Sequence, residues 1–239
     1  MSAFLISIYN INKVIKCYVF IALILSSSSV FSGSYEDFFK AGQFDDVAVV
    51  NHLLKRGFDP NTVNLNGDPA ILWAWKHGAL KTFEALIRHP KTQLNVKNEH
   101  GETPLMLVCL KGQINMAKLM ISRQADVNQP GWTPLHYAAT GGHTSLIQLL
   151  LEESAYIDAE SPNGTTPLMM AARYGNAKVT QLLIDEGADI SVKNQLGLTA
   201  MDFAIQGARP DTVRVMQLAL EALDASDKAK SRNKPTLAQ

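Results

Sequence analysis

The feature that most constrains this chain is a short segment that recurs at a nearly fixed spacing. Thr103, Thr133 and Thr166 each open a Thr-Pro-Leu triplet, and Thr199 opens the degenerate copy Thr-Ala-Met in the same frame. Residues 67–74 occupy that frame upstream. The copies recur at a period of about 33 residues, and self-similarity at such a period indicates a repeat architecture.

Each copy predicts two short helices. Thr133 is expected to cap the first helix through its hydroxyl, and Pro134 suits the first helical position, where no N–H is needed. A second apolar segment follows, and its spacing predicts that Leu146, Leu149 and Leu150 are buried on one face. Helices this short are marginal alone, so each copy must pack against its neighbours.

The best-preserved copy carries a family resemblance. Residues 131–138 read Gly-Trp-Thr-Pro-Leu-His-Tyr-Ala, which resembles the Thr-Pro-Leu-His-x-Ala motif of the ankyrin repeat family. The resemblance covers residues 35–220 and implies an all-α fold: an ankyrin-repeat solenoid of stacked helix-turn-helix units with short β-hairpin loops. It implies about six repeats, including degenerate caps, and a structural role for His136, whose ring bonds backbone groups near the hairpin.

Departures from the pattern predict local irregularities. The step from Thr103 to Thr133 is short because three residues are missing between Asn128 and Gly131, which predicts a truncated hairpin. Pro69 stands where other copies carry threonine, so that helix should lack a side-chain cap. We predict an ankyrin repeat domain over residues 33–223, closed by a helix at residues 213–223. The polar, basic residues 224–239 are expected to form a disordered tail.

Residues 1–32 have the pattern of a cleaved signal peptide. Lys13 and Lys16 precede a short apolar run at residues 17–25, and small residues lead to an expected cut between Ser32 and Gly33. The run is about half the roughly 20 residues of a spanning helix, although an uncleaved membrane anchor is the alternative. Cleavage would leave Cys109 as the only cysteine, so the mature protein could form no internal disulfide. This suits a protein of the bacterial periplasm, or a secreted protein. The chain would then contact the membrane only transiently, through its signal peptide.

Charge and motifs argue against several functions. The chain has 22 Lys and Arg against 22 Asp and Glu, without the basic excess typical of proteins that bind nucleic acid. The sequence has no nucleophile elbow, phosphate-binding loop, dinucleotide fingerprint or metal-binding motif. Cys109 matches the position of Ala139 and is expected to be a small buried hydrophobe. We therefore predict no catalytic residue, no cofactor, no metal and no small-molecule substrate.

The resemblance implies a recognition surface made of hairpin tips and exposed positions of the first helices. Trp, Tyr and Arg are the residues that most often dominate interface energies. For Trp73 and Tyr137, packing against neighbouring repeats is an equal alternative to exposure. The candidate protein-binding residues are Trp73, Lys76, His77, His100, Glu102, Lys111, Trp132, Tyr137, Thr140, Asn163, Thr165, Met170, Arg173 and Tyr174.

These observations predict a non-enzymatic protein–protein interaction module, exported and periplasmic, that binds a protein partner through its concave face. An inhibitor or immunity protein that neutralises a toxin or enzyme of the same compartment is the alternative. Two further hypotheses remain. The first is an enzyme, which labelling of Cys109 in the folded protein would test. The second is a cytosolic or host-delivered interaction protein, which analysis of the mature amino terminus would test.

Overall fold

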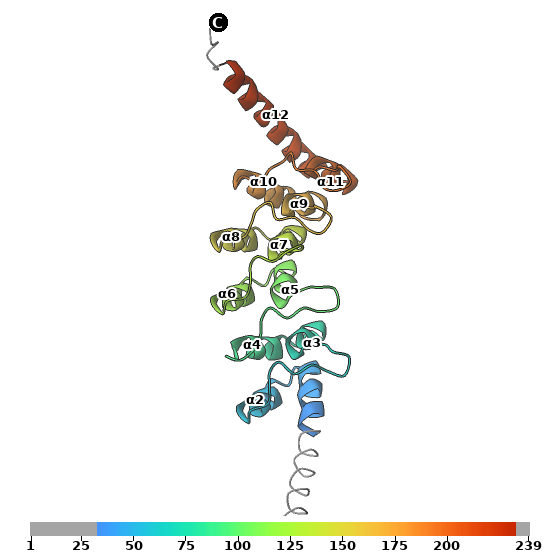
Figure 1. Ribbon diagram of the computed structural model, residues 1–239, viewed down its shortest axis with the longest axis vertical. Helices are drawn as coiled ribbons and strands as arrows, with labels where there is room; N and C mark the ends of the chain where they lie inside the picture. The colour runs from blue at the N-terminus through green and yellow to red at the C-terminus, as the bar shows by residue number, and fades with distance from the viewer. Residues whose placement is uncertain (1–32, 233–239) are drawn as a thin grey trace, which may run out of the picture. The chain divides into compact units, whose positions relative to one another are not determined.

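The computed structural model describes residues 33–232, with side chains described as far as residue 225 (Figure 1). The expected signal peptide at residues 1–32 and the end of the expected tail, residues 233–239, lie outside the described residues. The chain divides into two compact units, Met1–Thr92 and Gln93–Gln239. Within residues 33–232, none of the helices combines the length and the apolar character needed to cross a membrane.

The first unit contains a helix over residues 33–43, followed by α2 (Val47–Lys55), α3 (Ala70–Lys76) and α4 (Leu80–Arg88). Its core is rich in aromatic side chains: Phe38, Phe39 and Phe83 are buried, and the Phe38 ring lies 4.3 Å from that of Phe58. As expected from Pro69, α3 begins without a side-chain cap.

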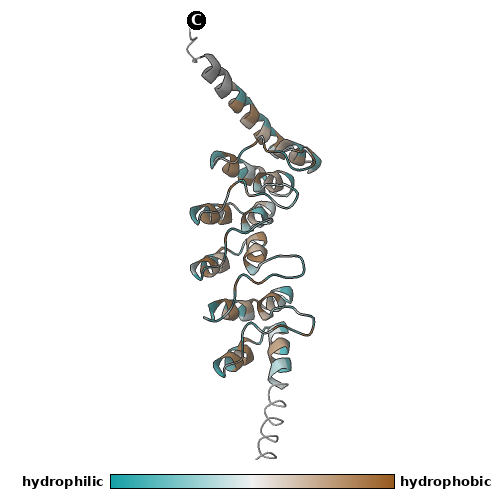
Figure 2. Ribbon diagram, viewed as in Figure 1, coloured by the Kyte–Doolittle hydropathy of each residue, from teal (hydrophilic) through white to brown (hydrophobic). Residues whose placement is uncertain are grey.

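The second unit contains four helix pairs. They are α5 (Pro104–Leu110) with α6 (Ile114–Ser122), α7 (Pro134–Gly141) with α8 (Thr144–Glu152), α9 (Pro167–Tyr174) with α10 (Ala177–Asp185), and α11 (Ala200–Gln206) with α12 (Pro210–Arg232). The first helices pack in order, α5 on α7, α7 on α9 and α9 on α11, while α6, α8, α10 and α12 form the second layer (Figures 1 and 2). Brown, apolar residues recur along the helices of both layers, as mutual packing of short helices requires (Figure 2).

Threonine caps three of the first helices, as predicted. The hydroxyls of Thr103, Thr166 and Thr199 each accept from the amide three residues on, at 3.4 Å. The expectation for Thr133 was wrong in its detail: its hydroxyl lies 2.9 Å from Nδ1 of His136, and its own amide donates to the same nitrogen. Nδ1 of His136 thus accepts from the threonine amide as the sulfur atoms of Met106 and Met169 do in their copies.

The loops between repeats are tight turns. Four of them close with a backbone hydrogen bond of 2.9 to 3.0 Å, and these run from Asn64 to Asp68, Asn98 to Glu102, Ser161 to Thr165 and Asn194 to Leu198. Val63 and Pro69 form an isolated antiparallel bridge. Within the described residues, no β-strand extends beyond this single bridge. The predicted truncated loop closes differently, because the side-chain amide of Gln129 donates to the carbonyl of Trp132 at 2.7 Å.

Two expectations about the second helices were wrong. In α8 the buried residues are Leu146, Ile147 and Leu150, while Leu149 is only half-buried. The closing helix α12 begins at Pro210, which suits a first helical position, and continues to Arg232. Residues 224–232 are therefore helical, where a disordered tail was expected.

Side chains also join successive repeats of the second unit. His143 Nε2 lies 3.0 Å from the carbonyl oxygen of Leu110, and Asn176 Nδ2 donates to that of Gly142 at 3.2 Å. Arg209 donates to the carbonyl oxygen of Tyr174 in the same manner. Each of these residues lies at the start of a second helix and bonds the end of the first helix one repeat earlier. The last carbonyls of a helix have no partner within it, so these contacts satisfy groups that would otherwise need water.

Candidate protein-binding surface

The partly exposed side of the first-helix layer in the second unit carries most of the predicted residues. Because α5, α7, α9 and α11 are in register, equivalent positions lie side by side. One row contains Leu107, Tyr137, Met170 and Phe203, of which Phe203 is buried, and the next contains Leu110, Thr140, Arg173 and Gln206. We call these two rows, with Lys111 and Tyr174 at the helix ends, the first-helix face.

Tyr137 is held in place by an acidic residue of the preceding loop. Its hydroxyl donates to Oε1 of Glu102 at 2.9 Å, and Oε2 of the same carboxylate accepts from Asn98 Nδ2 at 2.7 Å. Burial, and then the hydrogen bond and the charge of Glu102, raise the pKa of Tyr137. The phenol therefore stays neutral, and both oxygens of Glu102 already have partners within the protein.

Arg173 is the best-positioned charged group of this face. Its guanidinium carbon lies 5.2 Å from the centre of the Tyr174 ring and 6.0 Å from that of Phe203, and Nη1 donates to Gln206 at 3.0 Å. A guanidinium has five N–H donors, so one such bond leaves capacity for an acceptor on a partner. Tyr174 itself is 48% exposed.

The remaining first-helix residues differ in how much surface they present. Thr140 is half-buried, and its hydroxyl donates to the carbonyl of His136 at 2.8 Å, which uses its donor within the helix. Met170 is half-buried, and Lys111 is exposed at the end of α5. Of these three, Lys111 and Met170 offer more to a partner.

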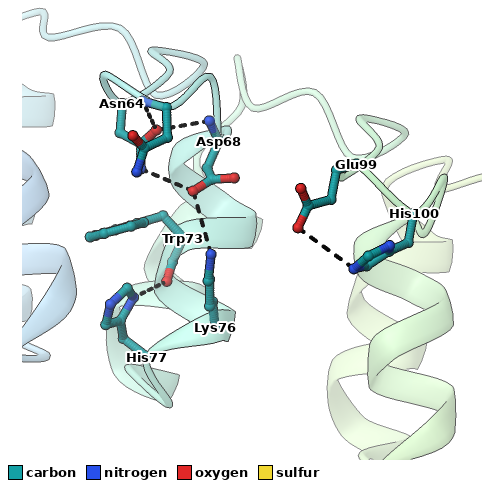
Figure 3. Close-up of polar contacts among 8 residues, drawn as sticks. Asn64, Asp68, Trp73, Lys76, His77, Glu99 and His100 are labelled. Carbon is teal, nitrogen blue, oxygen red and sulfur yellow. Dashed lines mark hydrogen bonds and ion pairs between the residues drawn. The ribbon is translucent and has the colours of Figure 1, made fainter.

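The predicted loop residues are less uniform. His100 is exposed, with Nε2 3.6 Å from a carboxylate oxygen of Glu99 (Figure 3). Trp132 is half-buried because its ring packs edge-on against His136, 5.1 Å away. Asn163 is exposed, although its side-chain oxygen accepts from the hydroxyl of Ser161 at 2.6 Å.

Thr165 was wrongly placed on the surface, because only 2% of it is exposed. Its amide donates to the Ser161 hydroxyl at 2.9 Å, and its carbonyl lies 2.9 Å from Nε2 of His136 in the preceding repeat. Since a carbonyl only accepts, Nε2 of His136 carries the proton. The structural role predicted for His136 is confirmed, because its ring bonds a backbone group of the following loop.

Trp73, Lys76 and His77 belong to the first unit, and Figure 3 shows their side chains. Trp73 packs against Phe39 and donates its indole N–H to that residue's carbonyl at 3.2 Å. The His77 ring is tilted against that of Trp73 with ring centres 4.0 Å apart, and its Nδ1 lies 2.9 Å from the Trp73 carbonyl. Lys76 is mostly exposed, 3.8 Å from the carboxylate of Asp68. Trp73 is thus half-buried by internal packing, and Lys76 is the most accessible of the three.

Leu107, Phe203 and Gln206 complete the two rows and were not among the predicted residues. Phe203 and Gln206 lie one full repeat after Met170 and Arg173, so the repeat frame could have found them. Of these two residues Gln206 is exposed, whereas only 7% of Phe203 is exposed.

Chemistry at Cys109 is disfavoured by its surroundings. The thiol is fully buried, as predicted, and burial raises its pKa, so it stays protonated. Reactive cysteines instead lie in exposed, electropositive places that favour the thiolate. Within residues 33–232, no three His, Cys, Asp or Glu side chains are grouped as ligands for a metal ion.

Parts of this chain are similar in sequence to known proteins. Ankyrin repeat and SAM domain-containing protein 6 of Rattus norvegicus is 38% identical over 109 residues, which are 44% of this chain and 12% of that protein. Protein phosphatase 1 regulatory subunit 27 of Mus musculus is 28% identical over 113 residues, 46% of this chain and 73% of that protein. This chain therefore spans a small part of the first relative and most of the second.

A solved structure matches more of the fold. It is a chain from the complex of the predatory endopeptidase Bd0816 from Bdellovibrio bacteriovorus with immunity protein Bd3460. The match has a TM-score of 0.64 and 26% identity, and it covers 76% of this chain and 96% of that one. The family model described as ankyrin repeats (3 copies) matches residues 38–130, 78–161, 125–194 and 155–222. Together with the repeat frame and the paired helices, these matches establish that the chain belongs to the ankyrin repeat family.

Proposed function

We propose that the second unit binds a protein partner through its first-helix face. Ankyrin repeats are in general non-enzymatic scaffolds for protein interaction, and the observation that carries the proposal is the arrangement around Arg173. An arginine set over two aromatic rings beside partly exposed Tyr137 and Met170 combines the residue types that most often dominate binding energy.

The charges of this face favour a partner segment that is apolar and acidic. Lys111 and Arg173 supply positive charge, whereas the nearby carboxylate of Glu102 is already bonded by Tyr137 and Asn98. A partner carboxylate could take the remaining donors of Arg173 in a bidentate bond. Leu107 and Met170 would then cover apolar side chains next to it.

Substitution of Arg173 and Tyr174 by alanine tests the proposal. The partner would be identified by cross-linking the full chain in its source cells, followed by mass spectrometry, and its affinity measured by calorimetry. We expect R173A/Y174A to weaken binding by about tenfold or more, because truncation of a central anchor commonly has this effect. Lys178→Ala is the matched control, since Lys178 is an exposed cation of the second-helix layer. Equal affinity of both variants and the unchanged protein, with an intact fold, would exclude this face.

A second candidate function is that of an inhibitor or immunity protein against a toxin or enzyme of the same compartment. It is supported by the likeness to a chain of the endopeptidase–immunity protein complex, which covers almost all of that chain. The test is to assay a peptidase that co-purifies with the protein, with and without added chain. Dose-dependent loss of peptidase activity supports inhibition, whereas bound but fully active peptidase supports a scaffold.

We also propose export, with cleavage between Ser32 and Gly33 and function in the periplasm. The support is the order of basic residues, short apolar run and small residues within residues 1–32. Mass spectrometry of the protein from fractionated cells would give the mature amino terminus and its compartment. An intact Met1 in the membrane fraction would instead indicate an anchor, and an intact Met1 in the cytosol would contradict export.

A further inference from the structure

A hollow lies in the second unit where α12 begins, next to α10. Its volume is about 430 Å³, and it is lined by residues 176–178 at the start of α10 and by residues 209–212 at the start of α12. No residue of the first-helix face lines it. The hollow is therefore separate from the surface that we propose for protein binding.

The start of α12 directs two backbone amides towards an acceptor outside the helix. Pro210 takes the first helical position and has no N–H, so the first donors are the amides of Asp211 and Thr212. Among the described residues, neither amide has a hydrogen-bond acceptor, whereas the next amide, that of Val213, already donates to the carbonyl of Arg209. The aligned peptide dipoles of a helix give this end a partial positive charge, and α12 is 23 residues long. The end of the helix therefore favours an anion.

The side chain of Thr212 supplies a third donor. Only 2% of Thr212 is exposed, the residue lines the hollow, and its hydroxyl bonds no other group of residues 33–232. Packing alone does not require this hydroxyl, because Val179 is fully buried at the equivalent position of α10. A buried polar group without a partner in the protein is unfavourable, and a ligand that accepts from it removes the cost.

The charged side chains at the hollow leave one positive charge. Lys178 and Asp211 have opposite charges and offset each other, which leaves the guanidinium of Arg209. Nη2 of Arg209 donates to the carbonyl oxygen of Tyr174 at 3.2 Å, and this bond helps to hold the side chain in place. A guanidinium has five N–H donors, so several remain for a ligand. Carboxylates and phosphates are the groups that fit such a donor best.

The first unit shows how a helix start of this kind holds an anion. Asp45 accepts from the amides of Lys81 and Thr82 at 3.3 and 2.8 Å, and these are the second and third residues of α4. The free amides of α12 belong to the same two positions of that helix. Gly175 stands in the place of Asp45, at the same distance in the sequence before them, and a glycine has no carboxylate. An anion at the start of α12 therefore comes from another molecule.

We propose that this hollow binds one anionic oxygen group of a ligand, either a carboxylate or a phosphate. The amides of Asp211 and Thr212 and the hydroxyl of Thr212 donate to its oxygens, and Arg209 pairs with its charge. Binding of a small anion requires neither the first-helix face nor a protein partner. The proposal therefore goes beyond the proposed function, and either one can fail without the other.

NMR titrations of the isotope-labelled full chain test the site directly. Inorganic phosphate and sodium acetate are added in separate titrations at constant ionic strength, with sodium chloride as the control salt. We expect the amide signals of Asp211 and Thr212 to shift and to saturate with phosphate, acetate or both, but not with chloride. The anion that binds more tightly identifies the chemical class of the ligand. The absence of a saturable shift with both anions, or an equal response to chloride, would overturn the proposal.

Substitutions of Thr212 test the buried hydroxyl. Thr212→Val should weaken binding of the tighter anion by about tenfold, because it removes one hydrogen bond to a charged group. The variant should keep its fold, since Val179 fills the equivalent position of α10. Thr212→Ser is the matched control, because it keeps the hydroxyl and should bind like the unchanged protein. Equal affinity of the valine variant, with an intact spectrum, would overturn the assignment of this site.

Two changes of charge distinguish the site from general attraction to a positive protein. Arg209→Ala should weaken binding by about tenfold through the lost charge-assisted bond, whereas Arg214→Ala should not, because Arg214 is exposed on the same helix but does not line the hollow. Asp211→Asn should strengthen binding, because it removes a like charge and keeps the amide. Equal losses in the two arginine variants, or weaker binding by Asp211→Asn, would refute the proposed site.

Discussion

At the scale of single residues, His136 connects two repeats through a buried neutral ring. Its Nε2 donates to the Thr165 carbonyl, its Nδ1 accepts from Thr133, and burial lowers its pKa from 6.5 to about 4. Between these values the unfolded chain binds the proton and the folded chain does not, so stability is lost as the pH falls from about 6.5 towards 4.

We therefore expect acidification from pH 7 to pH 5 to lower the free energy of unfolding by about 2 kcal/mol through this residue. Denaturant titrations at the two pH values would measure the change. H136M is the control, because Met106 and Met169 occupy the equivalent position and accept from the threonine amide through sulfur. An equal pH dependence in the unchanged protein and in H136M would contradict the assignment.

Burial also decides the reactivity of Cys109. A thiol that is fully buried and held protonated should resist alkylation in the folded protein. In a C17S background we expect a maleimide to label Cys109 only when denaturant is added, with mass spectrometry as the readout. Rapid labelling of the native protein would mean that the buried side of α5 becomes accessible to the reagent. It would also support the hypothesis that the protein is an enzyme.

At the scale of elements, α8 shows that two adjacent leucines of one helix can differ in burial. Leu150 is fully buried against the neighbouring repeats, while Leu149, next to it in sequence, is half-buried. Leu150→Ala should lower the free energy of unfolding by about 2–5 kcal/mol, as buried large-to-small changes do. Leu149→Ala removes the same atoms from a less buried site and should cost clearly less. Equal losses in denaturant titrations would mean that the rotation of α8 is wrong.

At the scale of the whole molecule, stability depends on bonds between neighbouring repeats. Asn176 caps α10 by accepting from Val179 at 3.0 Å, and it also donates to the carbonyl of Gly142 one repeat earlier. Asn176→Ala should cost about 0.5–2 kcal/mol as a lost cap, and more if the bond between repeats adds to it. Hydrogen exchange should rise in α10 and in the helices that pack on it, because repeats of a solenoid stabilise their neighbours.

Gln113 is the matched control for Asn176. It occupies the same position at the start of α6 but makes no capping bond with its side chain. Gln113→Ala should therefore leave both the free energy of unfolding and the exchange of α6 unchanged. A similar loss in the two variants would mean that the bonds of Asn176 carry little of the stability.

The sequence by itself determined the repeat frame, the starts of the first helices at the Thr-Pro pairs, the role of His136 and the burial of Cys109. These follow from signals that lie within one repeat and recur in the next. Only the tertiary structure decided that Ile147 rather than Leu149 is buried, that Thr165 lies beneath His136, and that α12 continues to Arg232. The first two depend on how one repeat meets the next, because burial is decided by the neighbour's side chains, whereas a local pattern reports only its own helix.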